Sequence, residues 1–405
     1  MSEWKQAALG DLAEVQLGKM LDRKNNQGEY RRYLGNDNVQ WNEFNLDGVK
    51  EMRFKENELE RFRLKKNDLL VCEGGDPGRC ALWEGEEELY YQKALNRVRV
   101  GEQLDARFLL YYMMYIGMTK EIRQYYTGGA TIKHLPNAAL KRVIVRYPSL
   151  RSQKKIAEIL DAYDKLIENN RKQISLLEEA AQRLYKEWFV DLRFPGYEDA
   201  AISGEIPLDW AFIPISEYAQ VVKGCSYSSG EIDVTSGIPM VNLASVSSWG
   251  GYNPFSERVY SGAYKAEQIL DKNDVVMAMT EQAPGLAGYV ARIPRYAAGA
   301  VPSMDLVCLR PMNGSKAYLY GTCRYGNVSR LLSPLANGTK IRHLKPEAFD
   351  YTKILVPPVE LQGRFEAAVA PAFSVIDVLY EKIALLQKGR NNVLPKLMSG
   401  EIEAL

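Results

Sequence analysis

The stretch that decides the fold is QKKIAEILDAYDKLIENNRKQISLLEEAAQRLYKEWFVD, from Gln153 to Asp191. It contains neither proline nor glycine, so no residue in it interrupts a helix. Its apolar residues recur at alternating intervals of four and three, which is the a/d seam of a coiled coil. Such a strict repeat drifts around a straight helix, and it therefore predicts supercoiling against a partner helix. The seam positions are Ile156, Leu160, Tyr163, Ile167, Asn170, Ile174, Leu177, Ala181, Leu184 and Trp188.

A helix over this stretch would be about 57 Å long, which is too long to be wrapped by one small core. The alternative interpretation is a helix lying on a globular domain, whose apolar face is usually wider and less regular than this seam. Asn170 is the polar member of the seam. A single buried Asn in a coiled coil more often fixes the register of the helices than it performs chemistry.

The C-terminal region repeats the seam and supplies the expected partner helix. Each member lies 209 residues after its counterpart in the first seam. Pro371 is expected to start or kink this second helix near its first turns, and Pro395 to end it. The second seam consists of Phe365, Val369, Ala372, Ile376, Leu379, Ile383, Leu386, Arg390, Val393 and Leu397.

The repeat extends beyond the helices. WKQAALGDLAEVQLG, from Trp4, aligns without a gap with WAFIPISEYAQVVKG, which begins 206 residues later at Trp210. GGATIKHL, from Gly128, matches NGTKIRHL, from Asn337. YPSLRSQ and VPPVELQ match immediately before the two predicted helices. The chain is therefore interpreted as a tandem duplication in the order globular, helix, globular, helix.

These patterns predict an α+β fold with two similar mixed α/β domains separated by two long antiparallel coiled-coil helices, in a pseudo-twofold tandem repeat. The helices are expected to be antiparallel because each globular copy returns the chain to the far end of the pair. The predicted segments are residues 1–147, the helical segment 148–193, residues 194–356 and the helical segment 357–405. Each globular copy has about 150 residues, an ordinary domain size.

The overall charge excludes a simple polycationic nucleic-acid binder. Lysine and arginine number 52 against 51 acidic residues, so any DNA site must be local. The five cysteines lack CxxC spacing and are interpreted as reduced, mostly buried thiols. The sequence shows no signal peptide and no long apolar span, which predicts a cytoplasmic protein.

Motifs for catalysis are scarce. A methyltransferase acting on a flipped base would need an NPPY-like tetrad, and YNPFSE around Asn253 lacks the second proline, so it is interpreted as a turn. No GxxxxGK[ST] loop is present. GGDPGR at 74–79 and EQAPGL at 281–286 occupy matching places in the two copies and fit structural hairpins or, less well, phosphate-contacting loops.

The two histidines, His134 and His343, occupy the same position of the repeat. Neither has a neighbouring cysteine or histidine with which to bind a metal ion. Their neighbours include Lys133 and Lys340, whose side chains suit phosphate contacts. The alternative interpretation is a plain loop-to-strand connection.

The duplicated layout, the segment QKKIAEIL…LEEAAQRLYKEWFVDLRFPG and the C-terminal VLPKLMSGEI resemble the specificity subunit of Type I restriction–modification enzymes. The resemblance covers the whole chain, strongly in the helices and weakly in the globular regions. It implies a non-catalytic DNA-specificity subunit with two target recognition domains, each reading one half of a bipartite asymmetric sequence. The helices would form a spacer that fixes the half-site separation and docks other subunits. One departure is that the second helix lacks the WFVDLRFPG tail and carries Pro371 and Arg390.

The resemblance also implies partners and cofactors. The partners would be double-stranded DNA, two modification (adenine methyltransferase) subunits and, in some complexes, two restriction (translocase and nuclease) subunits. No cofactor is expected in this chain. The assembled complex would use AdoMet in the modification subunits, and ATP and Mg²⁺ in the restriction subunits.

On this interpretation, base contacts come from polar side chains on loops that enter the major groove. A solvated surface charge is the competing explanation for each candidate, and no catalytic residue or metal ligand is expected. The candidates are Lys19, Arg23, Lys24, Arg31, Thr131 and Lys133 in the first domain, and Lys223, Tyr227, Ser228, Thr339, Lys340 and Arg342 in the second.

Aromatic residues at the end of the first helix allow two interpretations. Trp188 and Phe189 either pack on the domain that follows or dock a partner subunit. Tyr185 and Leu166 are expected on exposed faces of the spacer, where they would contribute to a partner surface.

Two other functions compete with DNA specificity. One is a nuclease or methyltransferase in a single chain, and the other is a structural protein that dimerises through long helices. The internal repeat favours DNA specificity, because duplicated domains suit two half-sites of one DNA target.

Overall fold

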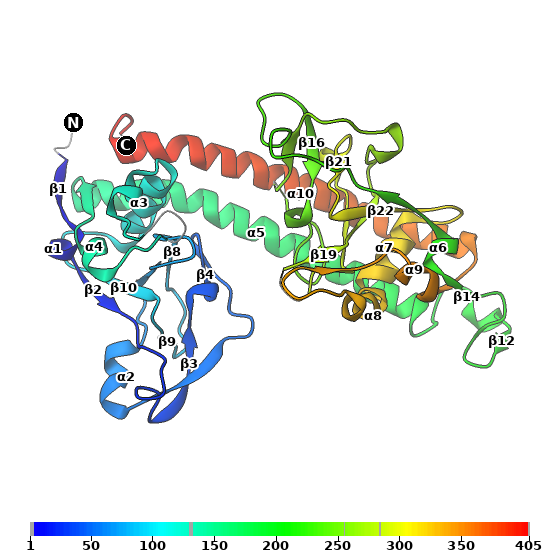
Figure 1. Cartoon of the computed structure of the whole chain (residues 1–405), viewed down its shortest axis with the longest axis horizontal. Helices are drawn as coiled ribbons and strands as arrows, with labels where there is room; N and C mark the ends of the chain where they lie inside the picture. Colours follow the sequence, from blue (N-terminus) through cyan, green and yellow to red (C-terminus); the bar gives the residue numbers. More distant parts are fainter. Residues whose placement is uncertain (1–3, 129–132, 255, 283–284, 404–405) are drawn as a thin grey trace. The chain divides into compact units, whose positions relative to one another are not determined.

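The computed structural model describes residues 4–128, 133–254, 256–282 and 285–403 (Figure 1). The chain divides into two compact units. Unit 1 comprises Met1–Lys165 and Gln387–Leu405, and unit 2 comprises Leu166–Leu386. Each unit consists of one globular lobe together with part of both long helices. The first lobe is residues 5–147 and the second lobe is residues 211–356.

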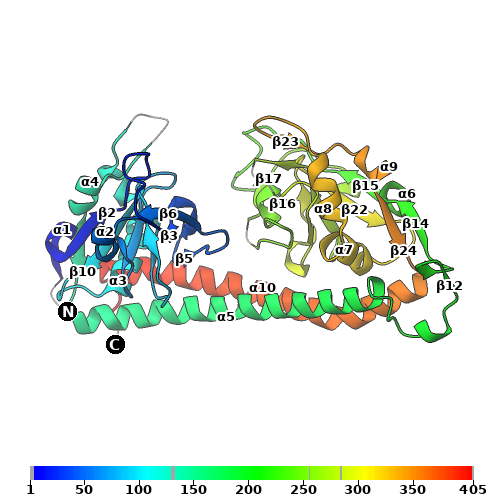
Figure 2. The same ribbon diagram turned by 90° about the horizontal axis from the view of Figure 1, so that it is seen from below.

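The two long helices are α5 (Leu150–Phe189, 40 residues) and α10 (Val359–Ser399, 41 residues). In unit 1, Ile156 near the start of α5 shares a core with Leu397 near the end of α10. In unit 2 the opposite ends meet, since the ring of Phe189 lies 5.1 Å from that of Phe365. Within each unit the helices therefore run antiparallel, as predicted (Figure 2). The predicted α+β class, with two mixed lobes in tandem, is also confirmed.

The predicted seam positions of both helices are shielded from solvent. Twelve of these positions are less than one tenth exposed, whereas the others, including Tyr163, Leu177 and Trp188, are partly buried. Arg390, the charged seam residue, forms an ion pair with Asp164 of α5 inside unit 1. The twelve buried positions are Ile156, Leu160, Ile167, Asn170, Ile174, Ala181, Phe365, Val369, Ile376, Leu379, Ile383 and Leu397.

Pro371 does not start α10, and Pro395 does not end it. The helix begins twelve residues before Pro371 and continues four residues past Pro395. Each proline removes one intrahelical hydrogen bond, and this penalty predicts an end or a kink. The helix persists because tertiary packing outweighs the local penalty: Val369 and Phe373, on either side of Pro371, are both buried.

The first lobe is built on two sheets and a helix. Its helix α3 (Ala106–Met118) is largely buried. The four-stranded sheet has the order β2 (Ala13–Leu17), β10 (Leu95–Val100), β7 (Leu69–Cys72), β8 (Cys80–Leu82). The three-stranded sheet has the order β6 (Lys50–Phe54), β3 (Glu29–Leu34), β9 (Tyr90–Tyr91). The pair β1 (Lys5–Ala8) and β11 (Ile144–Tyr147) joins the ends of the lobe. The shorter elements are α1 (Leu9–Leu12), β4 (Val39–Gln40), β5 (Glu43–Phe44), α2 (Glu56–Phe62) and α4 (Asn137–Lys141).

The second lobe repeats this topology, which explains the sequence duplication. Its four-stranded sheet has the order β15 (Ala219–Lys223), β22 (Leu306–Pro311), β18 (Val275–Ala278), β20 (Val290–Arg292). Its three-stranded sheet has the order β17 (Arg258–Tyr260), β16 (Ile238–Val241), β21 (Val301–Pro302), and β14 (Ala211–Pro214) pairs with β24 (Lys353–Val356). The pair β16 and β21 is parallel, as is β3 with β9 in the first lobe.

The remaining elements of unit 2 are short. The hairpin of β12 (Ile202–Ser203) and β13 (Ile206–Pro207) precedes the second lobe. Inside the lobe, β19 (Thr280–Glu281) pairs with β23 (Arg342–His343). The helices of the lobe are α6 (Ile215–Tyr218), α7 (Lys316–Arg324), α8 (Val328–Leu332) and α9 (Ala348–Tyr351).

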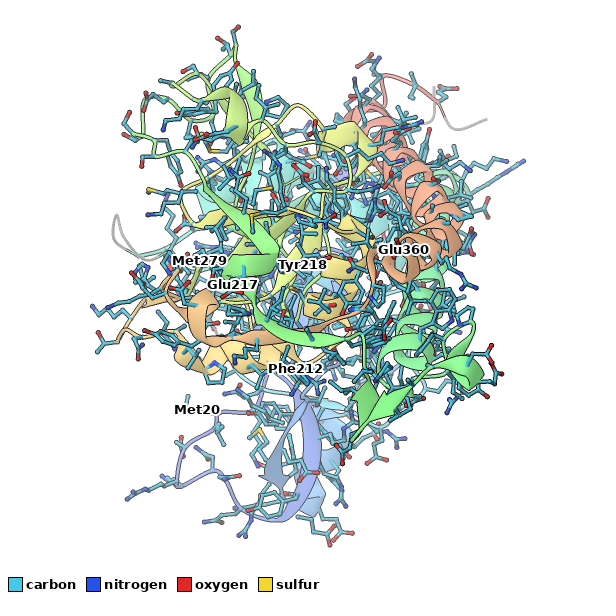
Figure 3. All side chains as sticks on the ribbon, turned by 90° about the vertical axis from the view of Figure 1, so that its right-hand side faces the viewer. Met20, Phe212, Glu217, Tyr218, Met279 and Glu360 are labelled. Atoms are coloured by element: carbon cyan, nitrogen blue, oxygen red, sulfur yellow. The ribbon has the colours of Figure 1, made fainter. Side chains whose placement is uncertain are left out.

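A buried glutamine ties each long helix to its lobe, and it lies in the matching segments YPSLRSQ and VPPVELQ. In unit 1, Oε1 of Gln153 accepts the N–H of Asp105, the residue that caps α3, at 2.8 Å. In unit 2, Oε1 of Gln362 accepts the N–H of Ser315, which caps α7, at 3.1 Å. Gln362 also accepts the hydroxyl of Tyr218 at 2.6 Å. Figure 3 shows Tyr218 on α6 and, near the start of α10, Glu360.

Polar contacts from the long helices complete this docking within each unit. In unit 1, the carboxylate of Asp164 accepts hydrogen bonds from the Tyr111 hydroxyl at 2.7 Å and the Asn42 amide at 2.8 Å. In unit 2, Asp377 of α10 pairs with Arg292 at 2.8 Å, and both side chains are almost fully buried. The lobes are therefore held on the helices by specific charged groups as well as by apolar packing.

Candidate nucleic-acid interface

Most of the candidate base-reading residues lie on two loops that recur in both lobes. The strand-exit loop, residues 18–28 and 224–237, leaves the first strand of each four-stranded sheet. The histidine hairpin, residues 127–134 and 337–343, closes just before the end of each lobe. In the second lobe, β23 of this hairpin lies on the side away from α5 and α10 (Figure 2).

The histidines hold these hairpins through their main chains. Thr127 and His134 exchange backbone hydrogen bonds of 2.8 and 2.9 Å, and Asn337 and His343 do the same at 2.9 and 2.8 Å. In both copies the next residue is a buried leucine whose N–H donates to the lobe at 2.7 Å. No group of three or more metal-binding side chains occurs in the described part of the chain.

The glycine-containing segments at 74–79 and 281–286 correspond in the structure with a shift of one residue relative to the alignment of the two copies. In the second lobe, Thr280 pairs with His343. In the first lobe, Gly74 lies beside His134, since a Cβ on Gly74 would be 3.2 Å from the histidine ring. Gly74 therefore corresponds to Thr280 and not to Glu281. The buried carboxylate of Glu281 accepts the N–H groups of Leu286 and Ala287, at 3.1 and 3.0 Å, which is the structural role that the sequence favoured for this segment.

Two glycines place the strand-exit loops against the lobe. A Cβ on Gly18 would lie 2.4 Å from the carbonyl carbon of Gln92, and a Cβ on Gly224 would lie 1.9 Å from the Ser303 oxygen. No larger residue fits these backbone approaches. The loops therefore start at the same point in both lobes and differ only beyond it.

The prediction that Lys19 contacts DNA is wrong, because its side chain is buried. Its side chain is only 3% exposed, and its ammonium donates to the Arg53 carbonyl at 2.8 Å and to the Glu58 carboxylate. It also lies 4.8 Å from the ring centre of Phe54. Burial alone would raise the pKa of Glu58, but hydrogen bonds from Lys19 and from the Lys55 N–H outweigh it and lower that pKa. Lys19 therefore stabilises the lobe from inside.

Arg342 is partly exposed, but its side chain is held by contacts within the lobe. Its guanidinium forms an ion pair with Glu281 and donates to the carbonyls of Ser333, at 3.1 Å, and Ala336, at 3.0 Å. These contacts fix the histidine hairpin and leave the arginine engaged within the protein. Arg31 lies on strand β3, where its guanidinium donates a hydrogen bond to the Glu29 carboxylate at 2.5 Å. This hydrogen bond raises the pKa of the guanidinium.

Most of the other candidates are exposed. Ser228 binds Glu231 through its N–H and its hydroxyl, at 2.7 and 2.8 Å, while Tyr227 is half-buried. Thr131 lies outside the described residues, and Thr339 is exposed. Five basic side chains are exposed and form no ion pair within the part of the chain that the structure describes: Arg23, Lys24, Lys133, Lys223 and Lys340.

The aromatic residues at the end of α5 pack on the lobe that follows. The ring of Phe189 lies 4.8 Å from that of Tyr318 and 6.0 Å from that of Trp210, and Trp188 contacts Phe365. The prediction that Tyr185 lies on an exposed face is wrong. Its side chain is 5% exposed, and its hydroxyl is 3.2 Å from that of Thr322. Leu166, by contrast, is 51% exposed.

A polar hollow in the second lobe was missed by the sequence analysis. It is lined by Trp249, Arg324 and Arg330, among others. The signal available in the sequence was a tryptophan followed by two glycines at 249–251, a pattern that favours an exposed turn. The two arginines lie 75 or more positions further along the chain, and only the fold brings them together.

Other expectations concern residues away from these loops. All five cysteines are free and buried, as predicted. In the described residues, no helix combines the length and the apolar character needed to span a bilayer.

Comparison with known proteins gives concordant matches. Residues 1–179 match the family model described as the Type I restriction modification DNA specificity domain. The MjaIX specificity subunit of Methanocaldococcus jannaschii is 27% identical over 299 residues, which is 72% of this chain and 68% of that protein. The MjaVIII specificity subunit of the same organism is 21% identical over 99% of this chain and 93% of its own.

Among solved structures, the S subunit of a Type I restriction–modification system from M. genitalium is similar, with a TM-score of 0.52. The two chains share 16% identity over 98% of this chain and 96% of that one. At this identity the likeness supports the fold alone.

Proposed function

We propose that this chain is a specificity subunit of a Type I restriction–modification enzyme and that each of its two lobes reads one half of a bipartite DNA sequence. Recognition of DNA sequence is the role of the family. The observation that carries the proposal is the repeated topology, because two lobes with the same strand order present equivalent loops to two half-sites. The loops differ in sequence beyond Gly18 and Gly224, so the two half-sites differ and the target is asymmetric.

The proposed division of labour follows the four segments of the chain. Residues 1–147 and 194–356 act as target recognition domains, and residues 148–193 and 357–405 form the spacer. The spacer sets the distance between half-sites and docks two modification subunits, to which two restriction subunits can add. The chemistry belongs to those partners, with AdoMet in the modification subunits and ATP and Mg²⁺ in the restriction subunits. This chain contributes no catalytic residue and no cofactor site of its own.

The proposal is tested by mapping adenine methylation in the host genome with and without this chain. The expected result is the loss of one bipartite motif whose two defined parts flank an unread spacer. Exchanging residues 211–356 for the second lobe of another specificity subunit should then change one part of the motif and leave the other part unaltered. An unchanged methylation pattern in the deletion strain would contradict the proposal.

A single-chain enzyme is the competing function. Purified chain is incubated with target DNA and either AdoMet or Mg²⁺, and methyl transfer or cleavage is measured with and without the modification subunits. Activity that needs no added subunit would favour this competitor over the specificity role.

A further inference from the structure

A hollow of about 850 Å³ opens on unit 2 between α5, α7, α8 and the loop that follows β16. Its lining includes three aromatic residues, Trp249, Tyr289 and Tyr325, and two arginines, Arg324 and Arg330. No aspartate or glutamate lies among its lining residues. The hollow therefore combines aromatic surfaces with a net positive charge, which suits a ligand that is both planar and anionic.

Trp249 is presented to solvent by an unusual backbone. Its φ is +64°, a left-handed conformation that a bulky residue rarely adopts. The conformation is held because its N–H donates to the Gly285 carbonyl at 2.7 Å and its own carbonyl accepts a hydrogen bond from Arg324. The indole is nevertheless 60% exposed, and its ring is nearly perpendicular to that of Tyr289. A strained residue that leaves its large apolar side chain in solvent indicates a binding role better than a packing role.

The arginines retain donors for a ligand. Arg324 donates its Nη1 to the Trp249 carbonyl, and its Nη2 makes no hydrogen bond within the described residues. Arg330 is exposed, and its side chain takes part in no hydrogen bond or ion pair within the described part of the chain. A guanidinium offers several donors in a planar fork that matches the oxygens of a phosphate group.

The first lobe differs at the equivalent positions. Counted from the helix caps Asp105 and Ser315, Arg324 corresponds to Met114, a buried apolar residue. Trp249 lies in a turn closed by the bridge of Val246 and Tyr252, and the hairpin of β4 and β5 is its counterpart in the first lobe. The tryptophan of that hairpin, Trp41, rests on α3 at Gly117 and donates to Asp76 at 3.0 Å. The pairing of an exposed indole with arginines is therefore a property of the second lobe and not of the shared fold.

We propose that this hollow binds one unstacked nucleotide, with its base against Trp249 and its phosphate on Arg324 and Arg330. Stacking of a base on an aromatic ring tolerates any base, and the arginines supply the charge for the phosphate. Two sources offer this chemistry: a free nucleoside monophosphate, and a nucleotide displaced from the stack of a DNA strand. Reading paired bases in a groove does not require such a site. Only binding of a displaced DNA nucleotide rests on the proposed function; binding of a free nucleotide does not.

The experiment uses the full chain and three probes: deoxyadenosine monophosphate, a duplex with one bulged nucleotide, and the same duplex fully paired. Binding is followed by quenching of tryptophan fluorescence and by calorimetry. Saturable binding of the monophosphate or of the bulged duplex is expected, with the quench lost in Trp249→Phe. Arg330→Gln should weaken it at least about tenfold, because a charge-assisted hydrogen bond is removed. Lys265→Gln, an exposed basic residue of the same lobe, is the matched control and should leave binding unchanged.

The outcomes separate the two sources. Binding of the monophosphate identifies a free nucleotide as ligand, whereas binding confined to the bulged duplex identifies a displaced DNA nucleotide. The inference is overturned if neither probe saturates, if Arg330→Gln binds as wild type does, or if inorganic phosphate competes as well as the nucleotide does. If the hollow binds no nucleotide but the bipartite methylation in the host depends on this chain, the proposed function still stands.

Discussion

At the scale of single residues, Gln362 shows how one buried side chain joins a long helix to its lobe. It is fully buried, and its amide also donates to the Pro357 carbonyl at 2.8 Å. Gln362→Leu removes this donor and leaves the Ser315 N–H and the Tyr218 hydroxyl without their acceptor. Each unsatisfied buried group costs about 1–3 kcal/mol, so we expect the unfolding free energy to fall by about 3 kcal/mol or more. Urea unfolding measures the loss, and Gln220→Leu at an exposed position of β15 is the control.

Asp274 predicts how stability responds to acid. Its carboxylate is inaccessible to solvent and pairs with Arg310 at 2.7 Å and Lys316 at 2.6 Å. Desolvation would raise the pKa of Asp274, but the hydrogen bonds from Arg310 and Lys316 outweigh it and lower that pKa. The contribution to stability is therefore complete above the unfolded-state pKa of about 3.9 and is lost as the pH falls toward the folded-state value.

This linkage is measured by urea unfolding at several pH values between about 3 and 7. Asp274→Asn should be less stable than wild type at neutral pH and should lose less stability below about pH 4. The exposed Asp209→Asn is the control and should follow the wild-type profile. Parallel profiles for wild type and Asp274→Asn would show that the carboxylate does not carry the acid sensitivity.

Lys340 is the sharpest residue-scale test of DNA contact. It is exposed on the histidine hairpin, unlike the neighbouring Arg342, which is engaged by Glu281. If Lys340 contacts a phosphate, Lys340→Ala in the assembled complex weakens binding to all sequences alike and lowers the slope of log K against log salt by about one unit. Lys265→Ala should change neither quantity. Unchanged affinity and slope in Lys340→Ala would remove this residue from the interface.

At the scale of elements, the periodicity of the sequence predicted α5 and α10 because a seven-residue repeat reports directly on which side of a helix is buried. Ile156, Ile376 and Leu397 are buried as that repeat requires. The continuation of α10 through Pro371 and past Pro395 was not predicted, because the proline penalty is local whereas the packing that overcomes it comes from residues distant in sequence. Lys19 was predicted as a surface residue for the same reason, because its partner Glu58 lies 39 positions away in the sequence.

Pro371 allows a prediction about the stability of α10. It is exposed within α10, and its ring prevents the hydrogen bond that residue 371 would otherwise donate to the Ala367 carbonyl. Pro371→Ala should therefore raise the unfolding free energy by about 1–3 kcal/mol. Pro395→Ala, in the last turns of the helix, should have a smaller effect. A loss of stability in Pro371→Ala would mean that the packing of Val369 and Phe373 requires the bend that a proline imposes.

At the scale of the whole molecule, duplication was the most informative feature of the sequence. Segments 206 to 209 residues apart predicted two lobes of one topology, and the paired histidines located equivalent hairpins in both. The net charge of +1 gave only the weaker statement that a DNA site must be local. Which exposed basic side chains meet DNA does not follow from either, because lobes with different targets share a scaffold and differ in their loops.

The proposed function predicts that the long helices set the distance between half-sites. Insertions are made in both helices at the junction of the units, after Lys165 in α5 and before Gln387 in α10. Three heptads add about 31 Å, close to the roughly 34 Å of one DNA turn, so the preferred unread spacer should lengthen by about 9–10 base pairs. One heptad adds about 10 Å, or about three base pairs, which places the second half-site on a different face of the duplex and should weaken binding at every spacing. Selection from a DNA library with randomised spacers measures both, and an unaltered spacer preference in the three-heptad variant would show that the helices do not set the distance.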